Sequence, residues 1–208
     1  MTVAAAEALA RLRDGNRRFV ASVNRGAQSL PTALPGVLTS EQQQPFAIVL
    51  GCSDSRVPAE IVFNQGLGEL FVIRVAGNIV APSQVGSVEF AASRYGTRLV
   101  VVLGHSHCGA ILATIESLRQ PGAVESRNVG SIVDRIRPSV EALMRTELRD
   151  DAAALTRAAV RSNVRISVDH LRHGSAVLER LSSEGGLMIV GAEYSLETGV
   201  VEFFDSDA

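Results

Sequence analysis

The sequence of 208 residues contains no lysine and no tryptophan, and its 20 basic residues are all arginine. Without lysine the chain cannot have a P-loop lysine, a Schiff-base lysine or a lysine general base. No apolar run reaches the roughly 18 residues that a membrane-spanning helix needs, and residues 1–20 lack the apolar core of a signal peptide. The net charge of −2 gives no electrostatic reason to expect nucleic acid or an anionic membrane. We therefore expect a cytoplasmic protein with neither partner.

Cysteine is also scarce, because Cys52 and Cys108 are the only two in the chain. Both stand among polar and turn-forming residues, so a disulfide framework is not expected and a reducing compartment is the natural setting. The hydrophobic fraction of 46% is ample for a sizeable core. The length predicts a single domain over residues 1–208.

Each cysteine closely follows an apolar run of the kind that forms a strand buried on both faces. The first run leads into Gly51-Cys52-Ser53-Asp54-Ser55-Arg56, and the second into Gly104-His105-Ser106-His107-Cys108-Gly109. Residues two apart in an extended segment point to the same side, which suits a metal held by the first cysteine and the aspartate. Two thiolates, one or two imidazoles and a carboxylate form a ligand set that suits zinc.

Hydrophobic periodicity predicts the secondary structure. Strands are expected over 46–50, 70–75, 99–103 and 187–190, with a hairpin that adds 200–204. Helices are expected over 4–13, with an interruption at Asp14-Gly15-Asn16, and over 83–95, 128–148 and 152–182, with a possible short helix near Ser40. We expect an α/β fold: an open, mostly parallel four-stranded sheet with an antiparallel edge strand, helices on its faces and an N-terminal helical arm over 1–25. Ligands of such sheets bind beyond the carboxyl ends of the strands, where a switch in strand order would bring both motifs.

The two motifs resemble those of the β-class carbonic anhydrases, which carry Cys-x-Asp-x-Arg after one strand and His-x-x-Cys-Gly after the next strand but one. Two further stretches are similar to that family and fall in the expected order. They are Leu12-x-x-Gly15-Asn16-x-Arg18-Phe19-Val20 and Gly68-Glu69-Leu70-Phe71-Val72-x-Arg74-x-Ala76-Gly77-Asn78. The resemblance spans essentially the whole chain.

The resemblance implies a zinc lyase that converts carbon dioxide reversibly to bicarbonate and a proton, by attack of zinc-bound hydroxide. The implied zinc ligands are Cys52, His105 and Cys108, because His105 rather than His107 matches the family's position. Asp54 and Arg56 are the implied catalytic pair. When Asp54 binds zinc, four protein ligands close the site; when Asp54 pairs with Arg56, one position opens for water.

The resemblance also suggests a substrate pocket and a partner. Phe71 and Val75 are candidates for an apolar wall, Gln65 for a hydrogen bond to a substrate oxygen, and Gly109 for a further substrate contact. The helical arm implies packing on a second subunit in a homodimer or homotetramer. Two alternatives stay open at this point: hydrolysis of carbon disulfide or carbonyl sulfide on the same scaffold, and a structural or redox zinc module with no catalytic role.

Overall fold

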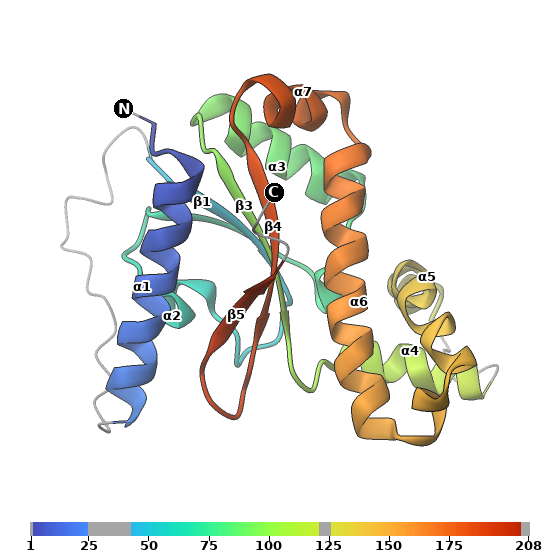
Figure 1. Ribbon diagram of the computed structural model, residues 1–208. Coiled ribbons are helices and arrows are strands. Elements are labelled where there is room, and N and C mark those ends of the chain that lie inside the picture. The colour runs from blue at the N-terminus through green and yellow to red at the C-terminus, as the bar shows by residue number, and fades with distance from the viewer. Residues whose placement is uncertain (1, 25–42, 121–125, 205–208) are drawn as a thin grey trace.

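The computed structural model describes residues 2–24, 43–120 and 126–204, whose strands form one five-stranded sheet of order β2-β1-β3-β4-β5 (Figure 1). The strands are β1 (Ala47–Gly51), β2 (Leu70–Arg74), β3 (Leu99–His105), β4 (Met188–Tyr194) and β5 (Val201–Phe204). The first four run parallel, and β5 pairs antiparallel with β4. The expected parallel sheet with an antiparallel edge strand is confirmed.

Helices cover both faces of the sheet and also its carboxyl edge. The α-helices are α1 (Ala5–Asn24), α2 (Ala59–Val62), α3 (Pro82–Arg94), α4 (Gly109–Arg119), α5 (Arg127–Glu141), α6 (Ala152–His173) and α7 (Ala176–Glu184). Short 3-10 helices are η2 (Ala76–Asn78), η3 (Leu143–Arg145) and η4 (Glu147–Asp150). Figure 1 shows α1 and α6 on opposite sides of the sheet. Among the helices of the described ranges, none is long and apolar enough to cross a membrane.

The apolar strands explain this layering, because alternate side chains of a strand point to opposite faces. Every residue of β1 and of β3 is buried. On one face, Val49 and Val101 pack in a cluster with residues of α1 and α2. On the other, Ile48 and Val100 pack with residues of α3, α6 and α7. Strands buried on both sides thus read as continuous apolar runs in the sequence.

The strand order puts the switch between β1 and β3. The chain goes from β1 outward to β2 and then returns to the other side of β1 as β3. Gly51 at the end of β1 is paired with Leu103 of β3, so the residues that follow the two strands arrive at the same place. A third apolar cluster, with residues of α4, α5 and α6, lies there and contains both cysteines.

The predicted interruption of the first helix at Asp14-Gly15-Asn16 is wrong, because α1 continues to Asn24. A Cβ atom on Gly15 would lie 1.8 Å from the carbonyl oxygen of Phe63, so this glycine permits a close approach of the helix instead of ending it. The buried amide of Asn16 donates to Val62 O (3.1 Å) and to Gly199 O (2.9 Å). These contacts hold α1 on its own chain, while its packing on a partner stays a prediction.

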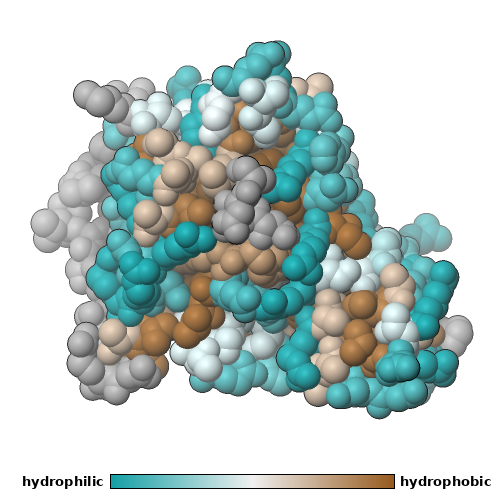
Figure 2. Space-filling model, in the orientation of Figure 1, coloured by the Kyte–Doolittle hydropathy of each residue, from teal (hydrophilic) through white to brown (hydrophobic). Residues whose placement is uncertain are grey.

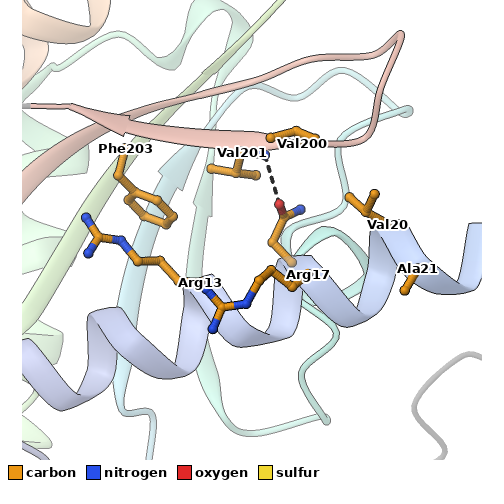
Figure 3. A pocket seen from close by; sticks show the side chains of 8 residues that line it. Arg13, Arg17, Val20, Ala21, Val200, Val201 and Phe203 are labelled. Carbon is orange, nitrogen blue, oxygen red and sulfur yellow. Dashed lines mark hydrogen bonds between the residues drawn. The ribbon is translucent and has the colours of Figure 1, made fainter.

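Asn16 also links α1 to β5, since its Oδ1 accepts a hydrogen bond from Val201 N (2.9 Å), drawn as the dashed line in Figure 3. Beside this bond, the guanidinium of Arg13 lies 5.4 Å from the ring centroid of Phe203. An open pocket of about 490 Å³ lies between the two elements. The helical arm and the last strand are therefore joined by specific polar contacts.

Two other predicted helices are shorter than expected. The one over 128–148 ends as α5 at Glu141, and η3 and η4 follow it. The one over 152–182 is broken at Gly174, and Ser175 starts α7 by accepting a hydrogen bond from Leu178 N (3.2 Å). A serine side chain that caps a helix competes with continuation of the preceding one. The possible helix near Ser40 lies outside the described residues.

The face seen in Figure 2 is hydrophilic over much of its rim, with hydrophobic surface in patches, one of them at the lower right, where Figure 1 shows α4 beside the lower part of α6. Exposed large apolar side chains include Leu112 on α4 and Val200 before β5. Such surface is a common feature of chains that associate with a partner.

Candidate metal centre

Two thiols and an imidazole meet beyond the carboxyl ends of β1 and β3. Cys52 follows β1, His105 ends β3, and Cys108 is the N-cap residue of α4. All three are buried, and their possible ligand atoms lie within 4.8 Å of one another. Both cysteines are free thiols. The structure thus brings together three of the predicted metal ligands in a group that can hold a metal ion.

The imidazole of His105 is oriented by its own backbone. Its Nδ1 lies 2.8 Å from Ser106 O, which can only accept, so Nδ1 carries the proton and Nε2 has the free lone pair. That Nε2 is buried and has no hydrogen-bond partner among the described residues. A buried polar atom left without a partner costs about 1 to 3 kcal/mol. A metal ion bound by this lone pair would remove that cost.

The two thiols are electrostatically coupled. The hydrogen bond from Cys108 lowers the pKa of Cys52 to about 4, although burial opposes the shift. The same hydrogen bond and burial raise the pKa of Cys108. The backbone N–H of Gly77 also donates to Cys52 Sγ (3.3 Å). One thiolate therefore discourages the other, and a dication between them would allow both to ionise.

Asp54 is held by Arg56 at the rim of this cluster. The guanidinium donates from Nε to Oδ1 (2.9 Å) and from Nη2 to Oδ2 (2.6 Å), and the backbone N of Arg56 also donates to Oδ1 (2.9 Å). These hydrogen bonds hold the pKa of Asp54 well below its usual range. Asp54 Oδ2 lies 3.9 Å from Nε2 of His105. The carboxylate is thus ionised, bound to the arginine, and close to the thiol and imidazole cluster.

Two residues that support the cluster were not among the predicted site residues. Arg74, at the end of β2, donates to Cys52 O (3.1 Å) and to Asp54 O (2.6 Å), and so fixes the backbone that carries the first motif. Gly77 donates to the thiol described above. Both belong to the stretch 68–78 that carried the family resemblance. Their positions were visible in the sequence, but their contacts require β2 to lie beside β1.

The predicted substrate-binding residues fall into two groups. Val75 packs in the apolar cluster that contains both cysteines, and Gly109 is the exposed first residue of α4, next to Cys108. Phe71 instead contacts Phe90, with ring centroids 6.3 Å apart. Gln65 donates to Phe63 O (2.8 Å) and lies against Gly15 of α1. The substrate roles of all four residues stay predictions.

His107 takes no part in the cluster. Its side chain is 67% exposed, and its Nε2 lies 2.6 Å from Oε1 of Glu197, in the turn between β4 and β5. Ser106 Oγ donates to the other oxygen of Glu197 (2.8 Å). Hydrogen bonds, first from Ser106 and also from Ser195 and His107, lower the pKa of Glu197 to about 2. No sequence signal pointed to Glu197, because it lies about 90 residues from Ser106 and His107.

Comparisons with known proteins agree with this geometry. The family model described as carbonic anhydrase matches residues 47–201. A carbonic anhydrase of Mycolicibacterium smegmatis is 38% identical over 197 residues, covering 92% of this chain and 89% of the relative. Carbonic anhydrase 2 of Mycobacterium tuberculosis is 36% identical over 188 residues, covering 90% and 87%.

Solved structures show the same fold. The β-carbonic anhydrase CcaA superimposes with a TM-score of 0.69 at 25% identity, covering 96% of this chain and 85% of that one. A tetrameric β-carbonic anhydrase from Sordaria macrospora gives a TM-score of 0.69 at 21% identity, covering 79% and 82%. With a family match over most of its length and relatives at 36–38% identity, the chain belongs to the carbonic anhydrase family, in its β class, and is an enzyme of the lyase type.

Proposed function

We propose that this enzyme hydrates carbon dioxide reversibly to bicarbonate and a proton, with zinc as its metal. The observation that carries the proposal is the buried group Cys52, His105 and Cys108, with an unpartnered imidazole nitrogen and Asp54 held beside it. Two thiolates and an imidazole are ligands that zinc prefers. Zinc bound there would supply a hydroxide nucleophile near neutral pH.

The position of Asp54 supports a catalytic rather than a structural site. With Asp54 bound to Arg56 through two side-chain hydrogen bonds, three protein ligands remain for the metal. Three is the number typical of catalytic zinc sites, whereas structural sites have four. We propose that Asp54 alternates between the metal and Arg56. When it is bound to Arg56, its ionised oxygens can accept a hydrogen bond from the nucleophile and fix its direction.

The proposal also covers the substrate pocket, the oligomeric state and the cellular compartment. A small apolar substrate would use the apolar side of the cluster near Val75, with Gly109, Phe71 and Gln65 as further candidates. We also propose a homodimer or homotetramer, since the relative from Sordaria macrospora is described as tetrameric and Phe90 and Leu112 are exposed here. Two free thiols kept as metal ligands suit the reducing cytoplasm.

The test is stopped-flow measurement of CO2 hydration on zinc-loaded protein, together with elemental analysis. We expect about one zinc per chain and activity that falls in Arg56→Ala, because Asp54 then loses its alternative partner. Arg127→Ala, at an exposed position of α5, is the matched control and should keep the parent rate. Stoichiometric zinc without hydration would refute the proposed reaction. Hydrolysis of carbon disulfide or carbonyl sulfide by that same protein would then identify the substrate.

A further inference from the structure

The turn between two of the proposed ligands contains only Ser106 and His107, so the backbone of these two residues sets the relative direction of the imidazole and the second thiol. His107 has a φ of 54°, in the left-handed region. That conformation is unfavourable for a residue with a Cβ atom. Ser106 N donates to Tyr194 O (3.0 Å), which continues the sheet by one bond. A strained turn of this kind needs contacts that hold it.

The contacts come from the turn between β4 and β5. Glu197 accepts from Ser106 Oγ (2.8 Å) and from Ser195 Oγ (2.9 Å) at one oxygen, and meets His107 Nε2 (2.6 Å) at the other. The backbone N of Leu196 donates back to Ser106 Oγ (2.9 Å). An isolated exposed ion pair contributes little to the stability of a fold. Here, however, a single carboxylate is bonded to both residues of the ligand turn, and such charge-assisted bonds are the stronger kind.

Apolar packing does not fill the space beside this turn. A cavity of about 660 Å³ lies there, and its lining includes Ser106, His107, Leu112 and Glu197. This cavity is partly open to solvent, and the side chains that line it have protein packing partners on one side only. The hydrogen bonds of Glu197 are therefore a main restraint on this side of the ligand turn.

We propose that Glu197 is a positioning residue of the metal centre, which holds the Ser106–His107 turn so that His105 and Cys108 keep the direction needed to retain the metal. The inference rests on the proposed zinc site. It also gives the exposed side chain of His107 a role, as the hydrogen-bond partner through which Glu197 holds the second residue of the turn. Metal-site residues that act through the ligands typically change metal affinity or activity by about 10 to 100-fold when replaced.

The test measures the rate of zinc release from the loaded, full-length protein to a coloured chelator. We expect Glu197→Ala to release zinc about tenfold faster than the parent, at the low end of that range. Glu197→Gln keeps one acceptor oxygen but no charge, so its rate of zinc release should fall between those of the parent and of Glu197→Ala. Glu202→Ala is the matched control, because Glu202 lines the same cavity, bonds Arg161 and has no bond to the ligand turn.

Two further readouts separate positioning from general stability. The absorption bands of the cobalt-substituted protein should shift in Glu197→Ala but not in Glu202→Ala, since they report ligand geometry. The unfolding midpoints of both variants in urea with excess zinc should agree. If Glu197→Ala releases zinc at the rate of Glu202→Ala, or is faster only in proportion to a lower midpoint, the proposal is wrong. A parent that binds no zinc would refute the proposed function as well; zinc retention without CO2 hydration would refute the function alone.

Discussion

Replacing Gly77 by alanine would disturb the fold and the metal centre together. Gly77 lies in η2 with a φ of 70°, and its N–H donates to Cys52 Sγ (3.3 Å). A Cβ atom there would lie 2.6 Å from Cδ1 of Ile136 and 3.0 Å from Cβ of Ala110. Ile136 is fully buried, so the end of its side chain must shift within the packed core to make room.

The expected cost follows from these two effects. Left-handed backbone costs an alanine about 1 to 2 kcal/mol. Displacement of Ile136 adds roughly 1 kcal/mol, at the low end for overpacking, because only the end of a flexible side chain must shift. We therefore expect Gly77→Ala to lower the free energy of unfolding by about 2 to 3 kcal/mol.

Gly86→Ala is the matched control. Gly86 is exposed within α3, and a Cβ atom there would meet nothing within 4 Å. The same chemical change in a helix interior should raise the free energy of unfolding by about 0.5 to 1 kcal/mol. The two substitutions are therefore expected to change the free energy of unfolding in opposite directions.

The assay is urea unfolding of the reduced protein, followed by circular dichroism, with a zinc-release measurement on the same samples. The midpoint of Gly77→Ala should fall at an unchanged denaturant slope. Zinc release should become faster, because the N–H that donates to Cys52 is displaced. A Gly77→Ala midpoint equal to or above that of the parent would refute the argument from strain and crowding.

Three other predictions follow from the same contacts. Cys52→Ser and Cys108→Ser should each abolish zinc binding, and elemental analysis that finds stoichiometric zinc in the double variant would contradict the ligand assignment. Asn16→Ala should lower the free energy of unfolding by about 3 kcal/mol, because three backbone groups lose their partner; an effect no larger than that of exposed Asn128→Ala in urea unfolding would show that water replaces the amide. The lowered pKa of Asp54 means that its pairing with Arg56 stabilises the protein above the ordinary carboxyl pKa near 4 and is lost as the pH falls below it. The difference in urea midpoint between the parent and Arg56→Gln should therefore be present at pH 7 and shrink in acid. A difference that grows in acid would show that the pairing of ionised Asp54 with Arg56 is not its cause.

The site was more predictable than the details of the helices. Both motifs are short and contiguous, and each follows an apolar run, so residues 52–56 and 105–108 could be identified as ligand-bearing segments before any contact was known. The wrong interruption of the first helix arose because glycine and asparagine usually end helices. At Gly15 and Asn16 tertiary contacts with Phe63 and Val201 prevailed over that local preference.

The alternation of strands and helices, the two strand-end motifs and the family could be predicted before any contact was known, since these depend on local periodicity and on residues that stand next to one another. A switch in strand order was expected to bring the two motifs together, but the pairing of β3 with β1, which lets His105 reach Cys52, is a property of the folded sheet. Only the tertiary structure decided that Arg74 and Glu197 hold the two motifs from distant segments. A hydrogen bond between residues 20 or 91 positions apart depends on how the sheet and its turns pack, and no local pattern encodes it.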